Sequence, residues 1–139
     1  MQKISKMDQD VFDDHQSEKG VYFATSNLGK LREVENILNC PVYQVTLSLI
    51  EIQSLDVWDV VARKAKDAYS HAEKPVLVED TGLYLSAWNG LPGALIAWFL
   101  KTMGTDGVCT MMSAYEDRRA IARTILGFYD GSRFHGFLG

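Results

Sequence analysis

Cysteine is scarce in this sequence, and neither cysteine nor histidine has the spacing of a metal site. The two cysteines, Cys40 and Cys109, are too few and too far apart for a disulfide framework. The three histidines, His15, His71 and His135, are scattered along the chain. We therefore expect no thiolate or imidazole metal centre, and we expect a reducing, cytoplasmic setting.

Long hydrophobic runs are also missing. The sequence has no run of 18 apolar residues, and its N-terminus lacks the apolar core of a signal peptide. The formal net charge of −4 argues against broad binding to nucleic acid, although a few local lysines could still bind a small anion. We expect a protein that neither spans a membrane nor binds a nucleic-acid polymer.

The sequence does contain alternating β-favouring and helical segments. Its 139 residues, 47% of them hydrophobic and 23% charged, predict a single globular domain. Residues 1–19 are polar and lack periodicity, which predicts a leader or flexible arm before a domain at 20–139. The order of segments predicts an α/β sandwich, three-layered in outline, with a mixed β-sheet. Predicted strands cover 21–24, 41–49, 75–80, 84–88, 120–129 and 133–138, and predicted helices cover 28–38, 56–71, 94–103 and 106–115.

Two of the predicted helices carry further information. The helix at 56–71 should begin after Asp56 as N-cap. Its buried stripe should consist of Val57, Val61, Ala65, Ala68 and Ala72. The segment 94–103 is apolar almost all round, which predicts a buried helix or a contact between subunits.

The stretch from Pro75 to Leu91 is the one around which the chain is organised. Its apolar start leads into two carboxylates, Glu79 and Asp80, followed by Thr81. An acid at the end of a buried strand is a common place for chemistry in α/β proteins. The stretch by itself equally allows a plain acidic turn, because Asp-Thr-Gly is good turn material.

A second candidate is the junction TSNLGK between the first strand and the first helix. A helix N-terminus offers backbone N–H groups to a phosphate, and a lysine adds a full charge. The segment is neither a Walker A loop nor a dinucleotide-binding glycine motif. Alone, it is better explained as an ordinary helix cap. Its residues are Thr25, Ser26, Asn27, Leu28, Gly29 and Lys30.

Glu51 and Asp80 could form a metal site together. Each follows a predicted strand, and Mg²⁺ commonly takes one or two carboxylates along with phosphate oxygens and water. Lys64, on the helix after Glu51, could reach the same cleft. The alternatives are a solvated turn residue for Glu51 and a lysine lying along the helix edge for Lys64.

Three long segments in one order resemble the inosine triphosphate pyrophosphatase family, which hydrolyses non-standard purine nucleoside triphosphates. The resemblance covers roughly Val21 to the C-terminus. Its segments are FATSNLGKLREVENIL, LIEIQSLDVWDVVARKAKDAY and VLVEDTGLYLSAWNGLPGALIAWFL. It implies an elongated α/β domain with a mixed sheet and a cleft between lobes, usually paired as a homodimer.

The resemblance also implies residue roles. Residues 25–30 would hold the triphosphate, and Lys64 would contact a phosphate and take part in catalysis. Glu51 and Asp80 would bind Mg²⁺, and Asp80 could instead be the base that activates water. Thr81 would lie beside the nucleotide, and Glu79 would support the site. The GALIAWFL segment would lie near the cleft or the dimer contact.

Family members continue beyond the hairpin at 120–138 with Phe-Gly-Trp-Asp-like and Ser-His-Arg motifs, which this sequence does not contain. We therefore expect a C-terminally truncated member that keeps the phosphate and metal half of the site. Three hypotheses remain open at this stage. The chain could be an active pyrophosphatase, a non-catalytic remnant that binds a nucleotide or a protein, or an assembly module that uses its last strand.

Overall fold

The computed structural model of the chain describes residues 20–49 and 52–139, so the predicted leader at 1–19 lies outside the described residues. The fold is α/β with a mixed sheet, which confirms the predicted class. In chain order the elements are β1 (Val21–Ala24), α2 (Leu28–Leu38), β2 (Val42–Val45), α3 (Val57–Ala72), β3 (Val76–Leu85), the 3-10 turn η1 (Ser86–Trp88), β4 (Pro92–Gly93), α4 (Ile96–Met112), β5 (Ala120–Tyr129) and β6 (Phe134–Leu138).

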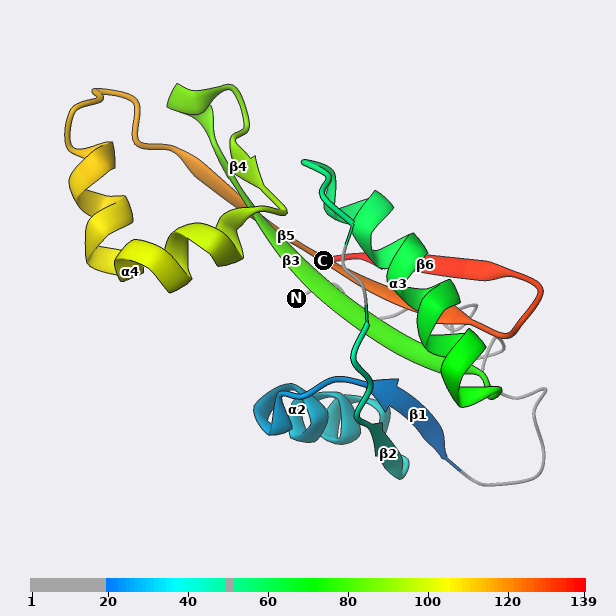
Figure 1. Ribbon diagram of the computed structural model, residues 1–139. Helices are drawn as coiled ribbons and strands as arrows, with labels where there is room; N and C mark the ends of the chain where they lie inside the picture. The colour runs from blue at the N-terminus through cyan, green and yellow to red at the C-terminus, as the bar shows by residue number, and fades with distance from the viewer. Residues whose placement is uncertain (1–19, 50–51) are drawn as a thin grey trace.

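The sheet has the strand order β2-β1-β3-β5-β6, with β4 also paired to β3. β1 is parallel to β2 and β3, whereas β5 is antiparallel to β3 and β6. β3 and β5 pair along their full length and form the long centre of the sheet. Figure 1 shows α4 beside one end of this pair and β1, β2 and α2 beside the other.

One edge of β3 is shared by two short strands. β1 pairs with β3 only at its start, where the last pair is Phe23↔Leu77. β4 pairs with β3 further along, at Leu83↔Gly93 and its neighbour. Since β5 occupies the other edge, residues 78–82 lie between the two short strands and pair with neither. The carboxylates Glu79 and Asp80 lie in this stretch of β3, which pairs with neither short strand.

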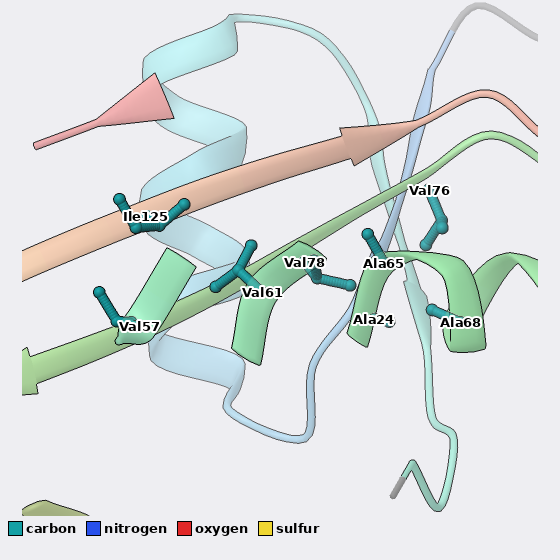
Figure 2. Packing of buried hydrophobic residues seen from close by; sticks show 8 residues of the cluster. All are labelled: Ala24, Val57, Val61, Ala65, Ala68, Val76, Val78 and Ile125. Atoms are coloured by element: carbon teal, nitrogen blue, oxygen red, sulfur yellow. The ribbon is translucent and has the colours of Figure 1, made fainter. Parts of the chain in front are cut away.

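Alternate strand residues face two separate cores, as the period of a β-strand requires. On one face, Val57, Val61 and Ala65 of α3 point toward Val76 and Val78 of β3 (Figure 2). On the other face, Phe23, Leu77 and Phe128 pack against side chains of α2. The sheet is therefore covered by α3 on one side and by α2 on the other.

The predicted start of α3 is confirmed, and its buried stripe nearly so. The Asp56 side chain accepts a hydrogen bond from the Trp58 N–H at 2.9 Å, as an N-cap should. The first four residues of the predicted stripe are buried, but Ala72 is only partly buried because α3 ends there. The second strand is shorter than the predicted 41–49 and stops at Val45.

The prediction that the central strand ends at its carboxylates is wrong. β3 runs on to Leu85, so Glu79, Asp80 and Thr81 lie inside it and form no turn. The strand continues because β5 provides hydrogen-bonding partners along its whole length. The predicted strand at 84–88 is also wrong, because its first two residues belong to β3 and the next three form η1.

The predicted helices at 94–103 and 106–115 form one element, α4, which is kinked at Gly104 where φ is +70° and ψ is 179°. Of the two alternatives predicted for the first of them, burial within its own chain is not observed, and a contact between subunits stays a prediction. Trp98 is 57% exposed, and Leu100 and Met103 are exposed as well. Within residues 20–49 and 52–139, no helix is long and apolar enough to span a membrane.

The predicted hairpin of β5 and β6 is confirmed, and Asp130 organises its turn. The Asp130 carboxylate accepts hydrogen bonds from the N–H groups of Arg133 and Ser132, each at 2.7 Å. These two bonds lower the pKa of Asp130 from 3.8 to about 2. Gly131 follows with φ +101°, and a Cβ there would collide with the Tyr69 ring.

Leu77→Ala is expected to lower the free energy of unfolding by about 2–5 kcal/mol, because the side chain is fully buried. Leu138→Ala is the matched control, since Leu138 is 66% exposed, and it should change stability by less than about 0.5 kcal/mol. Urea unfolding of the two variants measures both values. Equal losses would contradict the assigned core.

Asp130→Asn is expected to destabilise the fold at neutral pH and to lose this effect in acid. The pKa of Asp130 in the folded state lies below its ordinary value of 3.8. The ionised carboxylate therefore stabilises the fold fully above about pH 3.8, and this stabilisation is lost as the pH falls through about 2. Unfolding midpoints of variant and parent from neutral pH to about pH 2 check this. A constant difference across the range would contradict it.

Candidate active site

The loop between β1 and α2 is held by its own side chains. Asn27 Oδ1 accepts hydrogen bonds from the N–H groups of Gly29 at 2.9 Å and Lys30 at 3.2 Å, so Asn27 is the N-cap of α2. Thr25 Oγ1 accepts from the Asn27 N–H at 3.1 Å. Gln44 of β2 donates to the Thr25 carbonyl at 2.8 Å. The loop conformation is therefore fixed before any ligand binds.

This cap limits what the loop can offer an anion. The two amides nearest the lysine, those of Gly29 and Lys30, already donate to Asn27. Among the described residues, the N–H groups of Ser26 and Leu28 have no acceptor. A phosphate at this loop would thus meet these two amides and the Lys30 ammonium.

The two carboxylates of β3 point to opposite faces of the sheet. Glu79 and Thr81 lie on the α2 face, where Thr81 Oγ1 donates to Glu79 Oε1 at 2.9 Å. Thr81 Oγ1 also lies 2.8 Å from Thr124 Oγ1 of β5. Asp80 lies on the α3 face, and its Oδ1 accepts from the Thr81 N–H at 2.8 Å. The plane of the Asp80 carboxylate is therefore held by the backbone.

Each carboxylate has a lysine on its own face. Lys30 forms an ion pair with Glu79 Oε2. On the other face, Lys64 Nζ lies 3.9 Å from Asp80 Oδ2 and 3.4 Å from the Glu79 carbonyl oxygen. The side chains of Lys64 and Asp80 are 15% and 25% exposed. Both lysines therefore reach the same short piece of β3, from α2 and α3.

A hollow of about 330 Å³ opens at this piece of β3. Lys30, Asp80 and Thr81 form its polar end. The remaining lining residues are small or apolar and come from β3, α4 and β5: Gly82, Leu83, Ile96, Ala97, Leu100 and Ala122. Its size lies at the lower end of the range for small-molecule sites.

A larger hollow of about 510 Å³ lies elsewhere, between η1, β4 and α4. Its wall is aromatic and apolar, with Trp88, Phe99 and Tyr115 among the lining residues. Among the described residues that line it, none is charged and none is one that the sequence pattern singles out for chemistry. Hydrolysis of a charged substrate needs charged groups, so the smaller hollow is the better candidate for an active site.

The structure brings together part of the predicted set. Lys30, Asp80 and Thr81 share the hollow, and Lys64 lies beside Asp80. The loop residues 26–29 do not line the hollow. Glu51 falls outside the described residues.

Sequence reasoning missed the contribution of β5 to this site and foresaw that of α4 only in part. Thr124 meets Thr81 only because of the register between β3 and β5, and no local pattern specifies that register. The family resemblance partly indicated the apolar residues of α4, because it implies that GALIAWFL lies near the cleft or the dimer contact. Ile96, Ala97 and Leu100 from that segment do line the hollow.

The possible metal ligands among the described residues suit a hard cation such as Mg²⁺ only in part. No group of three or more acidic, cysteine or histidine side chains gathers anywhere in 20–49 or 52–139. Asp80 offers one carboxylate that lines the hollow, whereas Glu79 does not line it and is paired with Lys30. One carboxylate with room for phosphate oxygens and water does fit the habit of Mg²⁺.

Comparison with known proteins bears on these observations. The sequence model of the Ham1 family matches residues 21–139. The inosine triphosphate pyrophosphatase of Saccharomyces cerevisiae is 37% identical over 135 residues, which cover 88% of this chain and 68% of that protein. The dITP/XTP pyrophosphatase of Pyrococcus horikoshii is 33% identical over 122 residues, which cover 86% of this chain and 66% of that protein.

A solved structure gives the same result for the fold. The Ham1 protein of Staphylococcus aureus superimposes with a TM-score of 0.74 at 20% identity, over 87% of this chain and 69% of that one. The chain spans about two thirds of the length of these relatives. The resemblance carried by the three long sequence segments is confirmed: the chain belongs to the Ham1 family.

Proposed function

We propose that this chain is a nucleoside triphosphate pyrophosphatase of nucleotide metabolism. As a hydrolase it would convert the triphosphates of inosine, deoxyinosine and xanthosine to the monophosphate and pyrophosphate. The observation that carries the proposal is the hollow shared by Lys30, Asp80 and Thr81, with Lys64 beside Asp80. The names of the yeast and Pyrococcus relatives support this choice of substrates.

Two charged side chains would bind the triphosphate. Breaking the bond between the α and β phosphates builds up negative charge on phosphate oxygens, and fixed positive charge stabilises it. Lys30 lies at the polar end of the hollow, and Lys64 approaches β3 from the opposite face. The amides of Ser26 and Leu28 would add hydrogen bonds to phosphate oxygens. Thr81 would lie beside the nucleotide, with its hydroxyl kept by Glu79. These contacts would hold the substrate in one orientation.

Asp80 would orient and deprotonate the attacking water. Its Oδ1 is held by the Thr81 N–H, which fixes the direction of the whole carboxylate. Lys64 Nζ lies 3.9 Å from Oδ2 and places a positive charge beside this carboxylate. The proton would pass from water to Asp80, while pyrophosphate leaves with the electrons of the broken bond.

We propose Mg²⁺ as the cofactor, held by Asp80 and Glu51. The fit rests on Asp80, whose carboxylate lines a hollow with room for phosphate oxygens and water. When bound, the cation would supply positive charge to the phosphate oxygens. Lys30 and Lys64 would place further positive charge close to the phosphate oxygens.

Asp80→Asn is expected to reduce release of pyrophosphate from inosine triphosphate by at least about 100-fold, because the amide cannot accept the proton from water. Excess EDTA should stop pyrophosphate release by the parent protein, and added Mg²⁺ should restore this release. Asp106→Asn, on the exposed side of α4, is the control for the charge change. The assay uses a panel of purine and pyrimidine triphosphates.

Two outcomes would count against the proposal. If the parent and Asp80→Asn release pyrophosphate at equal rates, Asp80 has no role in the reaction. If the parent releases pyrophosphate from none of the nucleotides in the panel, the proposed activity itself is wrong. Thermal shifts with the same nucleotides would then report whether the chain is a binding protein without turnover.

We also propose that the chain forms a homodimer in the cytoplasm. Both cysteines are free thiols, which suits a reducing compartment. The exposed apolar side chains of α4, with Trp98, Leu100 and Met103 among them, support a contact between two copies.

Light scattering should therefore give twice the mass of one chain, and Trp98→Glu should shift the protein toward a single chain. Glu116→Gln, at an exposed position after α4, serves as the control. A parent protein that stays monomeric at every concentration tested would contradict the dimer.

A further inference from the structure

Glu79 is the charged group at this site for which the proposed reaction has no direct use. Its side chain is 11% exposed, and its Oε2 has no accessible surface. Oε2 forms the ion pair with Lys30 and accepts no other hydrogen bond from the described residues. Oε1 accepts from Thr81, which in turn contacts Thr124. The carboxylate therefore links Lys30 of α2 to two strands of the sheet.

Glu79 is paired with a residue of the hollow but does not line the hollow itself. Lys30 and Thr81 are among the residues that line the hollow, whereas Glu79 is not. A phosphate in the hollow would meet the ammonium of Lys30 and could not touch the covered Oε2. The carboxylate thus acts on a ligand through Lys30 and does not compete with it for direct contact.

The ion pair restricts both partners. A lysine carries a flexible four-carbon stem, and Lys30 is 40% exposed, so without an anchor its ammonium would move among many positions. A buried carboxylate needs a counter-charge, so Glu79 holds Lys30 in place. The Thr81 and Thr124 hydroxyls fix the carboxylate itself. The ammonium is therefore positioned before a substrate arrives.

We propose that Glu79 is a positioning residue for substrate binding: it holds the Lys30 ammonium at the mouth of the phosphate site and ties it to β3 and β5. This inference rests on the proposed function, because it assigns Glu79 a task in binding the triphosphate. The task concerns affinity, and the chemical step belongs to Asp80.

The test is a kinetic double-mutant cycle on Lys30→Met and Glu79→Gln with inosine triphosphate and Mg²⁺. Glutamine keeps the oxygen that accepts from Thr81 and removes the charge that holds Lys30. Glu79→Gln alone should raise KM about tenfold and leave kcat within about twofold. In the Lys30→Met background the same change should leave KM unaltered, because no ammonium remains to be positioned.

Stability provides a second readout of the pair. Lys30→Met leaves the buried carboxylate without its counter-charge, so its unfolding midpoint should fall, and Glu79→Gln added to it should restore most of the loss. Glu116→Gln is the matched control for charge and should alter neither KM nor the midpoint. These measurements also show whether each variant is folded before its kinetics are compared.

The outcomes separate this proposal from the proposed function. The positioning role would be overturned if Glu79→Gln left KM unchanged or lowered it. It would also be overturned if Glu79→Gln raised KM by the same factor in the parent and in the Lys30→Met variant. If the parent releases no pyrophosphate, the proposed function fails first, and calorimetric affinity for Mg²⁺-pyrophosphate replaces KM in the cycle. A loss of affinity for Glu79→Gln only when Lys30 is present would then still support the positioning role.

Discussion

Neighbouring side chains on an extended strand point to opposite faces, and this geometry governs the arrangement of Glu79 and Asp80. Because the two acids are adjacent in β3, they cannot share one side of the sheet. Each is paired with a lysine from a different helix, Lys30 of α2 or Lys64 of α3. The site is therefore built from both faces of the sheet at once.

This arrangement depends on the interval in β3 between its two short neighbours. β1 leaves the strand before the carboxylates, and β4 joins it after them. Groups from the two faces can meet at the edge between these strands, and Lys30 and Asp80 line one hollow there. The full pairing with β5 on the other edge keeps this part of β3 extended and fixed. A rigid strand with a partly unpaired edge thus positions charged groups accurately.

Much of this fold could be predicted from local patterns. The helical period placed α2 and α3, and the capping role of Asp56 followed from its side chain. For α2 the sequence predicted a capped start without choosing Asn27 among Thr25, Ser26 and Asn27. The reach of Lys64 toward Asp80 was also predicted from position along the chain. The Lys64 prediction was possible because its place at the edge of a buried stripe specifies the direction in which it points.

What the sequence could not supply were the partners of β3. The strand appeared to end at Asp80 because its acidic residues suit a turn, and only the distant β5 keeps it extended. That mistake hid the opposed directions of Glu79 and Asp80, and with them the pairing of Glu79 with Lys30. The exposure of Trp98 was also unpredictable, because an apolar helix can equally be buried by its own chain or by another copy.

The most direct test of the central claim follows the backbone and lysine signals of the protein by nuclear magnetic resonance during titration with Mg²⁺ and inorganic pyrophosphate. If the two faces of β3 form one anion site, the signals of Lys30, Thr81 and Lys64 will shift together and give one dissociation constant. Shifts at Lys30 alone, or two separate constants for Lys30 and Lys64, would show that the two faces do not act as a single site.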